Sequence, residues 1–180
     1  WRLTWGRRDT AYLPPEPLSD KFRSARAAVD MIPDGACVIS CGISGNARCS
    51  ILFWAVRERF EQSGHPRGLT WISVGGQGVR GRVPGTVEEV GLDGLVTTYI
   101  AGHTETAKSM LRLADENRLE LHTLPQGEMT HVIEAQGRGD YQVSSRTGIG
   151  SFLDSRVGRG SPVTPNATMQ FAHAHGDEIV

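Results

Sequence analysis

The sequence holds 180 residues, of which 38% are hydrophobic and 22% charged, and its 19 basic and 20 acidic side chains leave a formal net charge of −1. This length is enough for one domain with a core of its own. The even balance of charge argues against general nucleic-acid binding, which needs a basic surface, and against a highly charged disordered chain. No apolar run is long enough to span a bilayer, and no secretory signal opens the sequence.

The two ends of the sequence lack a regular pattern. Residues 1–20 are rich in Pro and Arg and are predicted to form an irregular extension, and residues 165–180 are predicted to form an irregular tail. Residues 21–164 are expected to form the domain between them. Because the sequence starts at Trp1 rather than Met and breaks off abruptly after Val180, we expect it to be a fragment.

Between these ends, runs typical of strands alternate with helical patterns. Short apolar runs, typical of buried strands, lie at residues 36–41, 69–74, 95–100 and 119–124, and residues 141–145 are a further candidate strand. Apolar residues at helical spacing lie at residues 24–31, 48–62, 105–117 and 128–136. The alternation predicts an α/β fold, with a mostly parallel sheet and helices on both faces.

The loops that follow the predicted strands are the expected ligand-binding part of this fold. In open parallel sheets, ligands bind beyond the carboxyl ends of the strands. The loops at residues 42–46, 75–81, 102–104 and 125–127 all follow strands, and we expect them to gather at one edge of the sheet.

The three cysteines, Cys37, Cys41 and Cys49, lie close together in the sequence. Their spacing is not that of a zinc site, and no His or Cys pair nearby completes a tetrahedral set, so no metal is predicted. We expect buried or half-buried free thiols in a reducing compartment, the cytoplasm.

One glycine-rich loop matches a nucleotide-binding pattern. The stretch Gly76–Gly81 reads G-x-G-x-x-G and follows a predicted strand, so a dinucleotide-binding domain is one hypothesis. The pattern needs a helix after its third glycine, but Gly81 is followed by Arg82-Val83-Pro84. The expected acidic residue is also missing after the next strand, which ends at Ala101-Gly102-His103. A chance match is therefore favoured, and the dinucleotide domain is kept as an alternative.

Two polar side chains lie at predicted strand ends. Gln126 follows the strand that ends at Leu124, where its amide and the free N–H groups of the next helix could stabilise an oxyanion or a carbonyl. The alternative is an exposed glutamine in an ordinary turn. His103 also follows a strand, and it could either bind a ligand or only hydrogen-bond a neighbouring loop.

Several short motifs occur in a fixed order between about Lys21 and about Thr164. They are Ile32–Gly35, Pro66–Ser73, Ala101–His103, Leu113–Asn117, Leu124–Gly127 and Gly148–Arg156. In this order they resemble the N-terminal, alpha-like half of the family I CoA-transferases, especially those that act on acetate, propionate and other short-chain acids. The family writes the last motif as G-[IVL]-G-T-F-x-D-P-R. The family's G-x-G-G-F loop is represented here only by Gly42 and Gly45.

The resemblance implies a covalent mechanism in which a glutamate carboxylate carries CoA as a thioester between two acids. It implies that Gln126 orients the substrate and stabilises the oxyanion, with an acyl-CoA and a short-chain carboxylate as substrates and no cofactor besides CoA. It also implies a set of positions that contact substrate or CoA: Gly42, Ser44, Gly45, His103, Gly127, Gly148, Gly150 and Ser151.

The same resemblance implies that the catalytic glutamate is missing. In this family it lies in an S-E-N-G-type motif of the second half, and this sequence has no such motif. We expect that half as a partner, either in cis or as a beta subunit, in a homo-oligomer without nucleic acid or membrane. The chain alone is then predicted to be inactive. A non-catalytic remnant of the fold and a hydrolase that releases the intermediate to water stay open as alternatives.

Overall fold

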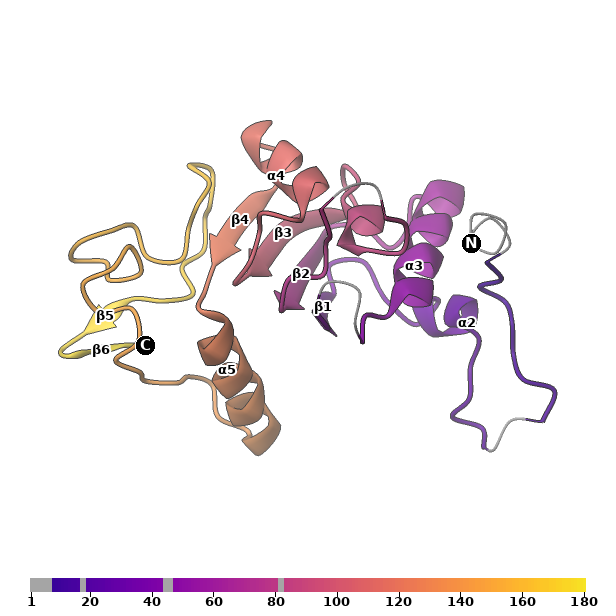
Figure 1. Ribbon diagram of the computed structural model, residues 1–180, viewed down its shortest axis with the longest axis horizontal. Helices are drawn as coiled ribbons and strands as arrows, with labels where there is room; N and C mark the ends of the chain where they lie inside the picture. Colours follow the sequence, from indigo (N-terminus) through magenta and orange to yellow (C-terminus); the bar gives the residue numbers. More distant parts are fainter. Residues whose placement is uncertain (1–7, 17–18, 44–46, 81–82) are drawn as a thin grey trace.

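The computed structural model describes residues 8–16, 19–43, 47–80 and 83–180. Within these ranges, four parallel strands form one sheet in the order β1-β2-β3-β4 (Figure 1). The strands are β1 (Cys37–Cys41), β2 (Leu69–Val74), β3 (Val96–Ala101) and β4 (Glu120–Thr123). The α/β class and the mainly parallel sheet predicted from the sequence are confirmed.

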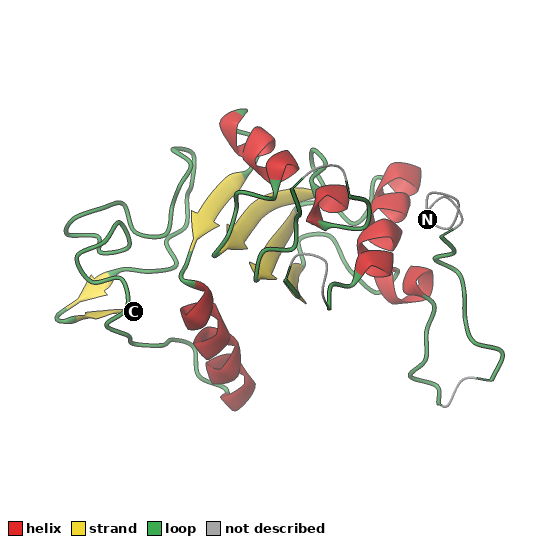
Figure 2. Cartoon of the chain, in the orientation of Figure 1, coloured by secondary structure: helices red, strands yellow, loops and turns green. Residues whose placement is uncertain are grey.

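The helices alternate with these strands along the chain (Figure 2). They are α2 (Ala25–Val29), α3 (Ser50–Ser63), the 3-10 helix η1 (Val87–Val90), α4 (Lys108–Asp115) and α5 (Gln126–Arg138). The Ser24 side chain accepts a hydrogen bond from the Ala27 N–H, which fixes the start of α2. Gly64 and Gly139 end α3 and α5 in the left-handed conformation, with φ of 73° and 88°. None of the described helices combines the length and the apolar character that crossing a bilayer requires.

The hydrophobic core lies on one face of the sheet. Leu69 and Trp71 point toward it from β2, and Phe53 of α3 packs on Trp71 with ring centroids 5.8 Å apart. Side chains of η1 and α4, such as Val87 and Met110, complete the same cluster. Crossovers between parallel strands are nearly always right-handed, and here each one steps the same way across the sheet. They therefore place α3, η1 and α4 on the same face.

The opposite face is covered mainly by α5, which lies on the side of the sheet away from α4 (Figure 1). Helices thus occupy both faces, as predicted, but the cover is unequal. The expectation of buried or half-buried thiols is wrong for Cys37 and Cys41, which are exposed, while Cys49 is half-buried. The physical reason is their place on β1, an edge strand whose outer face α5 does not cover.

The candidate strand at residues 141–145 does not form. Only Ser145 pairs there, in an isolated bridge to Ile179, and Tyr141 is fully exposed. The free edge of β4 is taken instead by residues 161–163, since the Thr123 N–H donates to the Ser161 carbonyl oxygen at 2.9 Å and the Val163 N–H to that of Leu121 at 2.8 Å. A later segment of the chain therefore satisfies the backbone groups that a fifth strand would have used.

The tail predicted to be irregular contains a short hairpin. The strands β5 (Ala174–His175) and β6 (Glu178–Ile179) pair in antiparallel fashion. Ile179 packs with Leu153 and Ala172 in a small second cluster of buried side chains. Segments from residues 145 to 179 thus form a lobe beside the sheet (Figure 1).

We predict that truncating Phe53 destabilises the domain far more than truncating its neighbour Ile51. Phe53 is fully buried, so Phe53→Ala leaves a cavity and should lower the free energy of unfolding by about 3–5 kcal/mol. Ile51, on the same helix but 41% exposed, should cost about 1 kcal/mol or less as Ile51→Ala. Urea denaturation followed by circular dichroism measures both. Equal losses would contradict the one-sided core.

Candidate functional site

The loops after the strands meet at the carboxyl edge of the sheet, where backbone packs on backbone. A Cβ atom added to Gly75 would collide with the Gly42 carbonyl oxygen and lie 3.5 Å from Nε2 of Gln126. A Cβ atom on Gly76 would lie 2.6 Å from Cδ2 of His103. Both positions therefore require glycine, because any side chain there would collide with these atoms. The predicted gathering of strand-end loops is confirmed for the described residues.

Gln126 lies at this edge, against the loops that follow β2 and β3. It is the first residue of α5, so the helix starts two residues earlier than the predicted Glu128, directly after Pro125, whose φ of −57° suits a helix start. A Cβ atom on Gly102 would lie 3.0 Å from the Gln126 backbone nitrogen. The side chain is exposed, and its amide and the free N–H groups of the first turn of α5 lie at the same end of the helix. Such neutral donors suit a carbonyl or an oxyanion.

A buried polar network supports the edge from below. The Gln77 side chain is 1% exposed, and its Oε1 accepts hydrogen bonds from Oγ of Ser40 at 2.5 Å and from Oγ of Ser73 at 3.2 Å. The Ser40 hydroxyl in turn accepts from Nε1 of Trp71 at 2.8 Å. Tyr99 is also buried here, and burial raises its pKa to about 12, so the phenol is neutral at ordinary pH. The network links the ends of β1 and β2 to the glycine-rich loop.

Sequence reasoning missed this network, although one signal was present. Both β1 and β2 contain an Ile-Ser pair near their ends, at residues 39–40 and 72–73, and the register places Ser40 beside Ser73. A polar residue at matching positions of two apolar strands indicates a buried partner. The sequence could not identify this partner as Gln77, because Gln77 reaches the two serines only when the loop after β2 folds back over the strand ends. In the described part of the chain, Nε2 of Gln77 is a buried donor without a partner.

The remaining predicted binding positions at this edge differ in how they are placed. Gly42 and His103 belong to the packed edge, with the His103 side chain exposed. Gly127 lies in the first turn of α5, with open space where a side chain would extend. Ser44 and Gly45 lie outside the described residues. The described residues contain no group of three or more His, Cys, Asp or Glu side chains that could hold a metal ion.

Gly148, Gly150 and Ser151 lie in a separate tight turn. The glycines adopt φ of 92° and 74°, and the Ser151 hydroxyl donates to the Gly148 carbonyl oxygen at 2.6 Å. The turn is joined to the start of α5 by the Ser145 hydroxyl, which donates to Glu128 at 2.9 Å. It therefore approaches the first turn of α5 rather than the glycine-rich edge itself.

Asp154 holds this turn together. Its buried carboxylate accepts hydrogen bonds from Nε and Nη2 of Arg156, both at 2.8 Å, and from the Gly150 N–H at 3.0 Å. The Arg156 guanidinium, followed by the Gly150 N–H, holds the pKa of Asp154 well below its usual range. Arg156 also donates to the Gly176 carbonyl oxygen at 2.7 Å, which ties the turn to the C-terminal hairpin.

Similar proteins are found by sequence and by structure, although no family model matches the chain. The chain is 29% identical over 165 residues to caffeate CoA-transferase of Acetobacterium woodii, covering 89% of this chain and 30% of that protein. It is 32% identical over 135 residues to acetate CoA-transferase YdiF of Escherichia coli K12, covering 74% of this chain and 25% of YdiF.

Two crystal structures of the acyl-CoA transferase YdiF from Escherichia coli O157:H7 share the fold, each at 26% identity. The apoenzyme matches with a TM-score of 0.81 over 93% of this chain and 33% of that chain, and a thioester complex with CoA matches with a TM-score of 0.78 over 86% and 32%. The chain thus spans about a quarter to a third of the length of these similar proteins.

We predict that Gly75→Ala disrupts the packed edge, whereas Gly127→Ala does not. Gly75 has a φ of +86° and no room for a Cβ, so the substitution should cost about 1–3 kcal/mol or more of unfolding free energy. Gly127 has open space in a helix, where alanine should be neutral or up to about 1 kcal/mol stabilising. Urea denaturation, together with the NMR shift of the Gln126 side-chain amide, measures both effects. An unchanged amide shift in Gly75→Ala would contradict the close approach.

We predict that Asp154→Asn lowers the melting temperature at pH 7, and that this difference shrinks in acid. Because the folded-state pKa of Asp154 is lowered, its stabilisation is complete above the ordinary carboxyl pKa of about 4 and is lost as the pH falls through the lowered value. Thermal unfolding between pH 7 and pH 3 tests this. A difference that stays constant with pH would show that the Asp154 charge does not stabilise the turn.

Proposed function

Because the chain is a relative of the family I CoA-transferases over most of its length, we propose that it forms part of an enzyme that moves CoA between a short-chain acyl-CoA and a free carboxylate. The matches to caffeate and acetate CoA-transferases support the reaction class. The observation that carries the proposal is the packed carboxyl edge, where Gly75 and Gly102 lie against the exposed Gln126, and Gly42 and His103 pack on Gly75 and Gly76.

In this proposal Gln126 stabilises negative charge that develops on the substrate carbonyl. When a carboxylate attacks a thioester, the carbonyl oxygen becomes an oxyanion, and fixed N–H donors lower the energy of that state. Gln126 and the free N–H groups at the start of α5 are such donors. The glycines and His103 around them would shape the space for the acyl group and the thioester, with Ser44, Gly45 and Gly127 as further contacts.

The covalent step needs a glutamate nucleophile, and the S-E-N-G-type motif expected to carry it does not occur in this sequence. A glutamate carboxylate would attack the acyl-CoA carbonyl, releasing the CoA thiolate and leaving an acyl-glutamyl anhydride. The CoA thiolate would attack the glutamyl carbonyl of the anhydride, releasing the first carboxylate, and an acceptor carboxylate would then take the CoA in the reverse sense. We assign this glutamate to a second half, in cis or as a separate subunit, with CoA itself as substrate and no further cofactor.

The dinucleotide alternative finds less support. After Gly78 the described chain reaches no α-helix before the 3-10 helix at Val87–Val90, and Gly81 lies outside the described residues. A Cβ atom on Gly78 would collide with the Thr106 carbonyl oxygen, so this glycine serves a contact within the domain. The contacts of Gly76 with His103 and of Gly78 with Thr106 thus explain these two glycines without a bound pyrophosphate.

We propose the cytoplasm as the compartment. The chain contains three cysteines, all of them free thiols, and Cys37 and Cys41 are exposed. Exposed thiols persist unpaired where the surroundings are reducing.

We predict that the chain alone shows no sustained acetate-dependent CoA exchange. Activity should appear when it is mixed with the part of Escherichia coli YdiF that lies outside the matched region, because that part would supply the glutamate. In the mixture, Gln126→Ala should lower kcat about 10²–10³-fold through loss of an oxyanion donor. Gln62→Ala, an exposed glutamine on α3, is the matched control and should leave kcat unchanged.

Three outcomes would argue against this function. Sustained turnover by the chain alone would place the nucleophile within these 180 residues. Equal effects of Gln126→Ala and Gln62→Ala would remove Gln126 from catalysis. If the two parts form a stable complex that shows no CoA exchange, the chain is better described as a non-catalytic domain that keeps the fold.

A further inference from the structure

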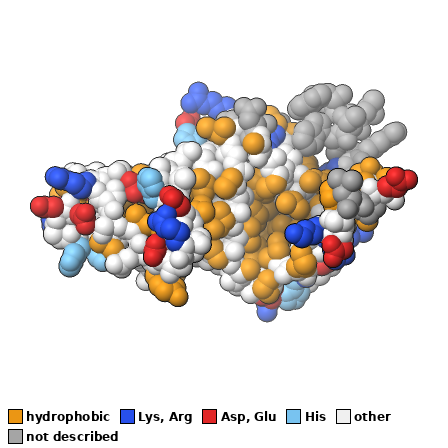
Figure 3. All heavy atoms as spheres, turned by 90° about the horizontal axis from the view of Figure 1, so that it is seen from below, with side chains coloured by type: hydrophobic (Ala, Val, Ile, Leu, Met, Phe, Trp, Pro, Cys, Tyr) orange, Lys and Arg blue, Asp and Glu red, His pale blue; other side chains and the backbone are white. Residues whose placement is uncertain are grey.

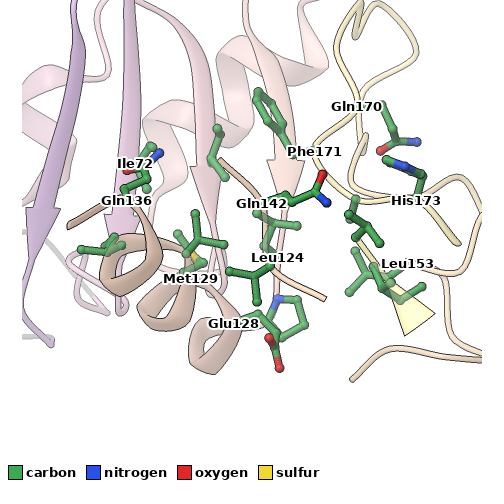
Figure 4. Close-up of a pocket in the computed structure, with 18 of the residues that line it drawn as sticks. Ile72, Leu124, Glu128, Met129, Gln136, Gln142, Leu153, Gln170, Phe171 and His173 are labelled. Carbon is green, nitrogen blue, oxygen red and sulfur yellow. The ribbon is translucent and has the colours of Figure 1, made fainter. Parts of the chain in front are cut away.

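The less covered face of the sheet carries a groove with a volume of about 510 Å³ (Figure 4). Its floor includes Ile39, Ile72 and Ile100, one from each of β1, β2 and β3. The opposite wall is the inner side of α5, with Met129 and Val132. Residues 170–173 and 179–180 close one end. The groove lies on a face of the sheet and borders the carboxyl edge that holds the candidate site, since Leu124, Pro125 and Glu128 also line it.

The groove is apolar and almost free of charge. Among the described residues that line it, Glu128 is the one carboxylate, and there is no Lys or Arg. Hydrophobic side chains gather on this side of the molecule (Figure 3), and Ile39 and Val132 are 42% and 37% exposed. CoA carries phosphates that need cationic or N–H partners, so it is a poor match to this surface. An apolar occupant fits better.

Among the described elements, the topology leaves one face of β1 and β2 largely uncovered by helices. Parallel sheets are normally buried on both faces, by helices. In the described chain the crossovers place α3, η1 and α4 on the core face and leave β1 and β2 open on the other, where α5 forms only one wall. In the solved CoA-transferases that share this fold, about two thirds of the chain lies outside the matched part. That additional chain is the available source of cover.

We propose that the groove binds an apolar α-helix from the part of a CoA-transferase that this chain does not match. This rests on the proposed function, in which the chain works together with that part. A helix presents a convex apolar ridge, and the groove between the sheet and α5 is concave. A second copy of this chain would present another concave face walled by its own α5, so it is the poorer fit.

The test is association with the part of Escherichia coli YdiF outside the matched region, purified separately. We expect a one-to-one complex in size-exclusion chromatography with light scattering, and protection of Cys37, which lines the groove, from N-ethylmaleimide. Ile39→Asp and, independently, Val132→Asp should each weaken binding at least tenfold. Met31→Asp is the control, since Met31 is 71% exposed and lies outside the groove. Circular dichroism checks that each variant is folded.

The outcomes separate this proposal from the proposed function. Absence of a complex, or equal binding by Ile39→Asp and Met31→Asp, would overturn the groove as the docking site. A homodimer of the wild-type chain that Ile39→Asp dissociates would overturn it in favour of a second copy. A complex lost in both groove variants, but without CoA exchange, would support the docking site and count against the proposed activity.

Discussion

At the carboxyl edge of the sheet, the Gly42 carbonyl oxygen occupies space that a side chain on Gly75 would need, and the start of α5 lies directly against Gly102. This close approach of backbone to backbone is the constraint on which the candidate site depends. A parallel sheet with strands in sequential order sends every strand end to one edge, and only glycine lets the loops there pack so tightly. The result is a closely packed frame that holds Gln126 at the start of a helix.

The frame is supported by buried polar groups rather than by ions. Gln77, Ser40, Ser73 and Trp71 are joined by hydrogen bonds beneath the loop, so the strand ends cannot shift without breaking hydrogen bonds in a buried setting. Neutral supports suit the proposed function, in which a transient negative charge would develop beside Gln126. The charged pair Asp154–Arg156 is placed elsewhere, in the turn that links α5 with the C-terminal hairpin.

The same topology explains why the molecule has one well-covered face and one open face. Successive crossovers that step in one direction build a single helical layer, and the core collects beneath it. What lies on the other face of β1 and β2, including the exposed thiols of Cys37 and Cys41, is open to an additional helical layer. The chain spans about a third of the solved structures that it matches.

The sequence by itself determined the four strands of the main sheet and the four α-helices, with their order, because apolar runs and helical spacing are local patterns; it did not reveal the 3-10 helix or the C-terminal hairpin. It also pointed to Gln126, since strand, turn and helix start lie within a few adjacent residues. Only the tertiary structure decided what depends on distant segments. Residues 161–163, rather than the candidate strand at 141–145, pair with the free edge of β4. The loop after β2 folds back and buries Gln77 beneath the site. The exposure of Cys37 and Cys41 was likewise decided by which face the crossovers cover, a property of the handedness of the whole sheet that no local pattern contains.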